Sequence, residues 1–297
     1  MAKASVQTGK KTAAPPPKGK AVAVADKKKA GAVTEAASDD VLALMRKNAG
    51  KGVSTAMEDN VVPLVYILQA LSPQVQRKKE EYIDGAEAGM IWFRGTKDVV
   101  AGEEGIPVVL CHWNKCWIEW LPDRGGYVGR HAERPEAATL VTDAQNPKKK
   151  FWRMPNGNTV VETREHVVLV LDVFDRPTPF VIPMSGSNHQ SSKEWMTAAN
   201  RKIIPGTDLK APLYGYIYRM KLKFRTNDQG DWFMWDIQDE NGEPTILTDF
   251  ATMQLANQMS DDFEKGALRA DNMTSDQVDD TANAGGGKGG AKAKEHI

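Results

Sequence analysis

Cysteine is scarce in this sequence, because its 297 residues include only two cysteines, Cys111 and Cys116. Two cysteines cannot build a disulfide scaffold, so a hydrophobic core has to hold the fold, and we expect both thiols to be reduced. Their odd spacing places them on opposite faces of a strand, and His112 between them does not complete a ligand set. We therefore expect no metal and no cofactor.

Long apolar runs are also missing. The longest, near residues 61–71 and 167–173, are too short to cross a bilayer, and the Lys-rich N-terminus lacks the apolar segment of a secretory signal. We expect a soluble, intracellular protein. The sequence contains no phosphate loop, dinucleotide fingerprint, His-Glu-x-x-His motif or nucleophile elbow, so we expect no enzymatic activity and no catalytic residues.

The charge is balanced overall but divided unevenly. Apolar residues make up 41% of the chain, charged residues 26%, and the formal net charge is zero. Residues 1–59 are predicted to be a disordered basic tail with a short helix near 39–48. Residues 60–265 are predicted to be a β-rich core with a closing helix. Residues 266–297 are predicted to be a disordered tail, first acidic and then Gly/Lys-rich.

Alternating apolar and polar residues predict several strands in the core. Met90–Phe93 is expected to be short, and Ile106–Leu121 is expected to be long or broken at 114–115. Val167–Leu171 is apolar on both faces, which is typical of a central strand. Pro179–Met184 is expected to lie at an edge, because proline donates no backbone hydrogen bond.

Two helices are expected beside these strands. Ser191–Glu194 fits a capping box, and Pro205-Gly206 would end that first helix, which carries the apolar stripe Trp195, Ala198, Ala199 and Ile203. The second would begin near Thr248, with the stripe Ala251, Leu255, Met259 and Phe263. This order predicts a mainly β, α+β fold with an oligonucleotide-binding (OB)-like Greek-key barrel at its core.

Residues Tyr214–Arg225 predict a strand with one apolar and one cationic face. Aromatic and aliphatic residues alternate with the cations Arg219, Lys221, Lys223 and Arg225. A polar turn then leads to a second strand, which in a matched register places Trp232 on the cationic face. Cations beside an aromatic ring suit single-stranded nucleic acid. The alternative is a half-buried strand whose solvent face happens to be basic.

A second basic and aromatic cluster lies in a segment bounded by Pro and Gly, where a loop is expected. Its members are Lys148, Lys149, Lys150, Phe151, Trp152 and Arg153. The cations would neutralise phosphates and the rings would stack on bases, unless the rings merely anchor the loop. Arg124 and Tyr127 of a Gly-rich loop, and Trp117 beside Lys115, are further candidate contacts, with a plain turn and a core residue as the alternatives.

Three segments and one tryptophan together resemble a group of bacteriophage early proteins that are regarded as single-stranded DNA-binding proteins. They are Leu68–Val75, Gly85–Ile91, Glu165–Asp172 and Trp195. The resemblance covers roughly residues 60–240. It implies a role in phage DNA replication, recombination or early transcription in the cytoplasm of a bacterial host. Such proteins commonly carry an acidic C-terminal segment, whereas here a neutral to basic end follows the acidic residues.

These observations together predict a non-catalytic single-stranded DNA-binding protein. Expected partners are single-stranded DNA and, through the acidic segment, phage replication or transcription proteins; no membrane is expected, and a homo-oligomer remains open. One alternative is a phage structural or scaffolding protein. The other is a DNA-processing nuclease whose carboxylates meet only in the fold.

Overall fold

The structure is a computed structural model that describes residues 43–44, 47–48, 61–122, 126–144, 147, 150–227 and 230–271. The chain divides into two units, Met1–Ser54 and Thr55–Ile297. In the first unit, residues 43, 44 and 47 are helical, and Asn48 Nδ2 donates to the Leu44 carbonyl. The disordered C-terminal tail was predicted over 266–297, but residues 266–271 are described and Arg269–Ala270 among them pairs as a strand, which corrects that boundary. The rest of the two predicted tails lies outside the described residues. The remaining description concerns the second unit.

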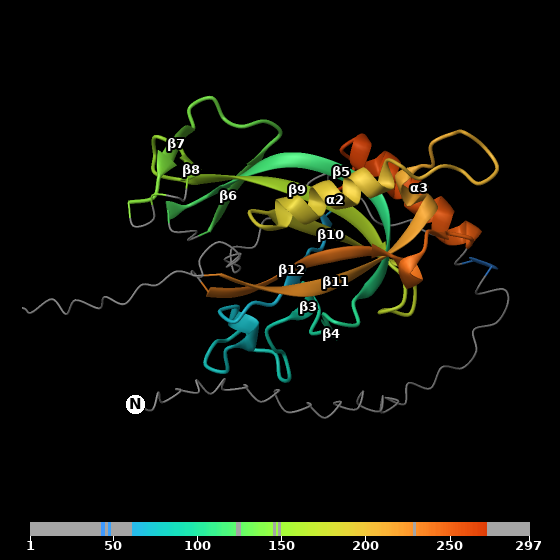
Figure 1. Cartoon of the computed structure of the whole chain (residues 1–297), viewed down its shortest axis with the longest axis horizontal. Helices are drawn as coiled ribbons and strands as arrows, with labels where there is room; N and C mark the ends of the chain where they lie inside the picture. Colours follow the sequence, from blue (N-terminus) through green and yellow to red (C-terminus); the bar gives the residue numbers. More distant parts are fainter. Residues whose placement is uncertain are drawn as a thin grey trace, which may run out of the picture. The chain divides into compact units, whose positions relative to one another are not determined.

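Two long antiparallel strands organise the second unit (Figure 1). They are β5 (Ile106–Trp120) and β9 (Thr159–Val170), which pair along most of their length. β5 is a continuous long strand through 114–115, where the sequence left a break open. Its pairing with β9 contains a bulge between Leu110 and His112. Val109 and Cys111, two residues apart, share a face and pack into one apolar cluster.

The main sheet runs in the order β12-β11-β5-β9-β8-β7, with three more strands attached to this path. β11 (Tyr216–Asn227) and β12 (Gly230–Asp239) form a hairpin. β10 (Thr178–Ser185) pairs with β9, and β13 (Thr245–Ile246) pairs with β11. The others are β6 (Tyr127–His131), β7 (Thr139–Thr142) and β8 (Lys150–Arg153).

The strands β6, β7 and β8 gather at one end of the β5–β9 pair (Figure 1). We call this region, residues 113–120, 126–144, 147 and 150–165, the arm. Two smaller sheets complete the β structure. One is β2 (Val65–Ile67), β3 (Met90–Phe93) and β4 (Val99–Ala101); the other joins β1 (Val61–Val62) to β14 (Arg269–Ala270) in parallel.

Short 3-10 helices link several of these elements. They are η2 (Pro73–Val75), η4 (Leu213–Gly215) and η5 (Glu240–Gly242). The two α-helices of the described second unit are α2 (Asn188–Ala199) and α3 (Phe250–Glu264). The expected order, with one helix between β10 and β11 and one after β12, is therefore confirmed.

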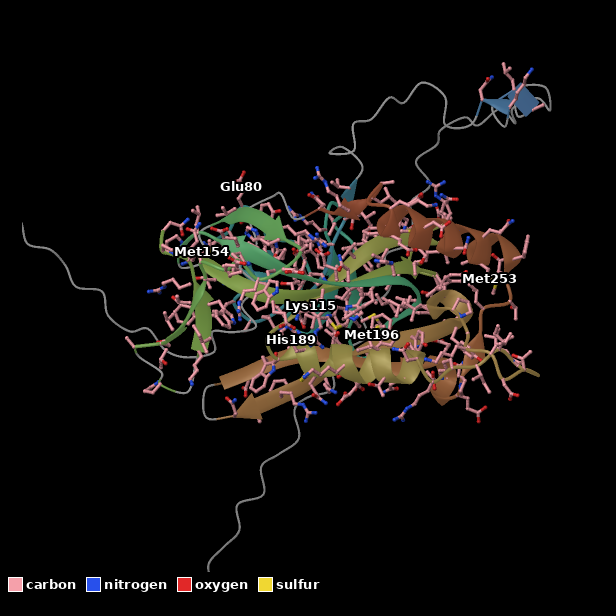
Figure 2. All side chains as sticks on the ribbon, turned by 90° about the horizontal axis from the view of Figure 1, so that it is seen from above. Glu80, Lys115, Met154, His189, Met196 and Met253 are labelled. Atoms are coloured by element: carbon pink, nitrogen blue, oxygen red, sulfur yellow. The ribbon has the colours of Figure 1, made fainter. Side chains whose placement is uncertain are left out.

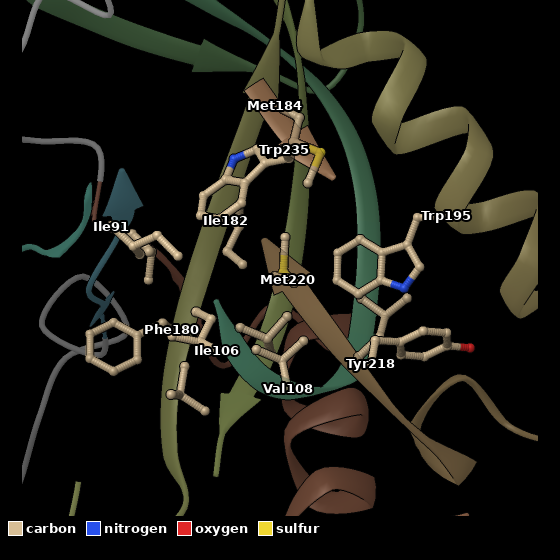
Figure 3. Close-up of a cluster of buried hydrophobic side chains, with 14 of the residues drawn as sticks. Ile91, Ile106, Val108, Phe180, Ile182, Met184, Trp195, Tyr218, Met220 and Trp235 are labelled. Atoms are coloured by element: carbon tan, nitrogen blue, oxygen red, sulfur yellow. The ribbon is translucent and has the colours of Figure 1, made fainter. Parts of the chain in front are cut away.

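The apolar core lies between the main sheet, β2, β3 and α2. Figure 3 shows side chains from several of these elements turned into it, among them Met220 of β11, Trp195 of α2 and Trp235 of β12. A second apolar cluster lies on the opposite face of β5 and β9, where Ala256 and Met259 of α3 cover it. The two clusters explain why the central part of β9 is apolar on both faces.

The helix boundaries and stripes differ from the prediction. α2 begins before the expected capping box, and Ser191 and Ser192 are buried partners of Trp235 and His166 rather than caps. Ala198 is exposed, and Ile203 is 51% exposed beyond the helix end. In α3 the buried residues are Thr252, Ala256 and Met259, whereas the expected Ala251 and Leu255 are exposed.

The outer edge of β12 is bound by side chains instead of by another strand. Gln69 Nε2 donates to the Phe233 carbonyl, and Gln69 Oε1 accepts from the Phe233 N–H. Asn188 Oδ1 accepts from the Trp235 N–H, and Ser191 Oγ donates to the Trp235 carbonyl. The described residues thus form a β-rich α+β fold with open sheets, and β10 and β12 are not joined by a ladder within them.

Candidate nucleic-acid interface

The β11–β12 hairpin has the matched register, one of the registers that the sequence pattern leaves open. Arg225 lies opposite Trp232, Lys223 opposite Met234 and Lys221 opposite Asp236. Because directly opposed residues share a face, Trp232 stands on the same side as the four cations. Phe233 and Trp235 face the other way and contribute to the apolar core.

Acidic neighbours neutralise two of these four cations. Arg219 forms a bidentate pair with Glu240, with Nη2–Oε1 at 2.6 Å and Nε–Oε2 at 3.0 Å. This hydrogen bonding holds the pKa of Arg219 above its ordinary value. Lys223 Nζ lies 3.1 Å from Asp236 Oδ1.

Lys221 and Arg225 have no acidic partner among the described residues. Arg225 is exposed at the tip of the hairpin, and Lys221 is half-buried. Trp232, opposite Arg225, is half-buried, and its indole N–H has no hydrogen-bond partner within the described chain. The free positive charge of this face is therefore carried by two residues rather than four.

Residues 150–153 form a strand, which corrects the expected loop. β8 pairs with β7 on one side and with β9 on the other. Alternation along the strand puts Lys150 and Trp152 on one face and Phe151 and Arg153 on the other, so the two rings cannot serve one surface. Lys148 and Lys149 lie outside the described residues.

Trp152 is held in a small apolar cluster on one face of the arm. Its ring meets Trp117 edge-on at 6.3 Å between centroids, and Ala138 and Val160 are buried in the same cluster. The guanidinium carbon of Arg134 lies 3.8 Å from the Trp152 ring centroid. On the opposite face, the guanidinium carbon of Arg153 lies 5.0 Å from the Phe151 ring.

The third candidate site is only partly described, because Arg124 lies outside the described residues. Tyr127 belongs to β6, where it is half-buried and meets Trp120 edge-on at 6.2 Å. Burial raises the pKa of its hydroxyl. Nearby, Arg130 forms a bidentate pair with buried Glu165, with Nη2–Oε2 at 2.8 Å. Tyr127 is thus packed against other side chains of the arm.

Comparison with known families places this chain among phage proteins. A protein-family model described as Pam3 phage gp34-like protein matches residues 29–269. The chain belongs to the Pam3 phage gp34-like family. The phage origin implied by the sequence resemblance is therefore confirmed. No curated protein and no solved structure matches the chain.

In this gp34-like chain, the family match spans β1 and reaches Arg269 in β14, the two strands that pair at the ends of the described body.

The described residues contain no group of three or more His, Cys, Asp or Glu side chains able to hold a metal ion. Both cysteines are buried free thiols. No helix among the described residues is long and apolar enough to span a membrane.

Sequence reasoning did not single out Arg134 of this gp34-like chain. It did single out Trp117 and Lys115, and the structure joins them to the same face: Lys115 Nζ lies 5.8 Å from the Trp117 ring. In Figure 2, Lys115 lies closer to the centre of the main sheet than Met154 does. Met154 packs with Trp117 and Trp152. The period-two pattern of the strand predicts that Lys115 and Trp117 share a face. No such pattern predicts the contact of Arg134, because its partner Trp152 is distant in sequence.

Proposed function

We propose that this phage protein is a non-catalytic single-stranded DNA-binding protein of the host cytoplasm that acts in phage DNA replication, recombination or early transcription. One observation carries the proposal. On one face of the β11–β12 hairpin, Lys221 and Arg225 have no acidic partner among the described residues, and a half-buried Trp232 stands opposite Arg225. Free cations beside an indole ring provide phosphate neutralisation and base stacking together.

The strand order supports this proposal. Neighbouring strands in the sheet follow the order β10-β9-β5-β11-β12, and along the chain α2 lies between β10 and β11. An OB barrel has the same arrangement. In place of a β10–β12 ladder, β2 contacts both strands, and side chains bind the edge of β12. We therefore interpret the fold as an OB-like barrel that is opened between β10 and β12.

The positions of the candidate clusters within that barrel also support DNA binding. OB proteins bind oligonucleotides with the loop between their first and second strands and the loop between their fourth and fifth. Here the first connection contains the arm strands β6–β8, and the second is the turn between β11 and β12. Trp152 and Lys150 lie in the first, and Arg225 and Trp232 flank the second.

A titration with oligo-dT tests the proposal. We expect tryptophan emission to be quenched at low salt, and binding to weaken steeply as salt rises. The salt slope is the slope of the logarithm of the binding constant against the logarithm of the salt concentration. Each lost phosphate contact on a single strand reduces the magnitude of this slope by about 0.7, so Lys221→Gln with Arg225→Gln should reduce it by about 1.4. A wild-type protein that shows no quench at low salt would argue decisively against DNA binding.

A charge-matched control comes from two exposed cations away from the hairpin, Lys193 of α2 and Arg201 just beyond it. Neither has an acidic partner among the described residues. The double variant Lys193→Gln, Arg201→Gln removes the same charge and should keep the wild-type slope. An equal loss of slope in both double variants would mean that binding follows net charge and that the hairpin is not a specific contact surface.

A structural or scaffolding role is the second candidate. Exposed apolar side chains near the start of α3 favour it, since Phe250 is 70% exposed and Ile246 is 41% exposed. Sizing at several protein concentrations, with and without oligo-dT, separates the two candidates. Concentration-dependent assembly without DNA binding would favour scaffolding.

A further inference from the structure

Arg134 of the arm contacts Trp152, a contact that the amino-acid sequence does not predict. Arg134 is exposed in the connection between β6 and β7, and its guanidinium carbon lies 3.8 Å from the Trp152 ring centroid. An approach in the plane of the ring would leave the two groups farther apart, because the ring atoms themselves would intervene. The guanidinium therefore lies over the indole face, as in a cation–π pair.

The support beneath Arg134 is rigid. Trp117, only 8% exposed, meets Trp152 edge-on, and Ala138 and Val160 fill the same cluster. Trp152 thus cannot turn away without disturbing buried neighbours. Arg134 has no acidic partner among the described residues, although Glu133 is adjacent to it in the chain. Its charge is therefore available to a ligand.

The surroundings of this stack carry positive charge. Lys150 lies on the same face of β8 as Trp152, is exposed, and has no acidic partner among the described residues. Further along the arm, Lys115 lies against Trp117, but its Nζ also lies 3.6 Å from Glu162 Oε2, so its charge is already paired. Lys150 is thus the cation that accompanies the ring-supported guanidinium, and a guanidinium plane is itself a surface on which nucleobases stack.

We propose that Arg134 is a base-stacking residue of the DNA site. A nucleobase stacks on the outer side of the guanidinium, Trp152 supports the guanidinium from beneath, and Lys150 neutralises a neighbouring phosphate. The inference rests on the proposed function, and it assigns a contact outside the β11–β12 hairpin. It requires the flat shape of Arg134 as well as its charge.

Arg134→Lys separates shape from charge, because lysine keeps the charge and lacks the plane. We expect this variant to bind oligo-dT about fivefold to 150-fold more weakly, which is the loss of affinity that one stacked base gives, with an unchanged salt slope. Arg153→Lys is the matched control. It alters the other ring-stacked arginine of the arm, on the opposite face of β8, and should bind within about twofold of wild type.

An oligonucleotide of abasic sites distinguishes stacking from a structural role. If Arg134 stacks on a base, wild type and Arg134→Lys should bind the abasic strand about equally. A penalty of the same size on the abasic strand would overturn the inference, as would wild-type affinity of Arg134→Lys for oligo-dT. Thermal unfolding of each variant confirms that the arm is folded.

The outcomes for the two proposals differ. Wild-type protein that binds neither strand at low salt refutes DNA binding and, with it, the role of Arg134. Wild-type binding to oligo-dT together with an unaffected Arg134→Lys refutes the role of Arg134 alone and leaves the hairpin surface as the proposed site.

Discussion

The edge of β12 allows a direct test of how the core is closed. Gln69 is buried, and its amide accepts from the Phe233 N–H at 2.9 Å and donates to the Phe233 carbonyl at 2.8 Å. A neighbouring strand would make the same pair of bonds. The substitution Gln69→Leu removes both hydrogen bonds and keeps a side chain of similar size.

The expected cost follows from the two backbone groups left without partners. A buried polar group that loses its hydrogen bond costs about 1–3 kcal/mol. Phe233 is only half-buried, so water reaches part of this edge and the lower half of that range applies. We expect Gln69→Leu to lower the free energy of unfolding by about 2–4 kcal/mol, a large part of the roughly 5–15 kcal/mol of a typical domain.

Urea unfolding followed by far-UV circular dichroism measures this cost. We expect a lower midpoint with an unchanged m-value, because the surface exposed on unfolding stays the same. The control is Gln76→Leu, which removes a single exposed hydrogen bond to the Leu71 carbonyl at 2.7 Å and should cost less than about 1 kcal/mol. If Gln69→Leu matches wild type within about 0.5 kcal/mol, solvent satisfies the β12 edge and Gln69 does not close the core.

Three further predictions concern the hairpin and a buried histidine. Glu240→Gln frees Arg219, so affinity for oligo-dT should rise and the salt slope should steepen by about 0.7; an unchanged slope would show that Arg219 cannot reach a phosphate. Trp232→Ala should weaken oligo-dT binding by about 1–3 kcal/mol, the contribution of one stacked base, whereas Trp232→Phe should retain most of the affinity. Equal losses of affinity in the two variants would point to a structural role of Trp232. Burial lowers the pKa of His166 to about 3, so the unfolded state binds more protons below pH 6.5, and the free energy of unfolding should fall by about 1.4 kcal/mol per pH unit from there toward pH 5; the same slope in His166→Phe would assign the loss to other groups.

The sequence pattern is informative where neighbours along the chain decide the structure. Strict alternation predicts the two faces of β11 and a short turn predicts the hairpin, whereas the sequence leaves a one-residue slip of the pairing open. The structure has the matched register, from the Tyr218 and Asp239 pair to the Asn227 and Gly230 pair. The central position of β9 follows from its apolar run. Both results depend on a periodicity that is visible within a few residues.

The errors arise where a distant segment decides. The Ser191–Glu194 pattern fits a capping box, yet Ser191 and Ser192 are buried against β12 and β9, and α2 starts before them. Residues 150–153 resemble a basic loop, but pairing with β7 and β9 makes them a strand. The contact between Arg134 and Trp152 joins two segments whose proximity no local pattern predicts.

The position of α3 limits where a bound strand can run. In OB proteins the face of the second and third strands contributes to oligonucleotide binding. Under the proposed OB-like interpretation, the corresponding strands would be β9 and β10. The outer face of Val167, Leu169 and Val181 is buried in the cluster that also contains Ala256 and Met259 of α3.

A polyanion cannot reach that face while the helix is in place, and the acidic Asp261, Asp262 and Glu264 at the end of α3 would repel it. The proposed contacts, Arg134 and Trp152 on the arm and Arg225 and Trp232 on the hairpin, all lie outside the covered area. Cross-linking of a photoreactive oligonucleotide should therefore label the arm and the hairpin and leave α3 unlabelled. Labelling concentrated on α3 would contradict this route.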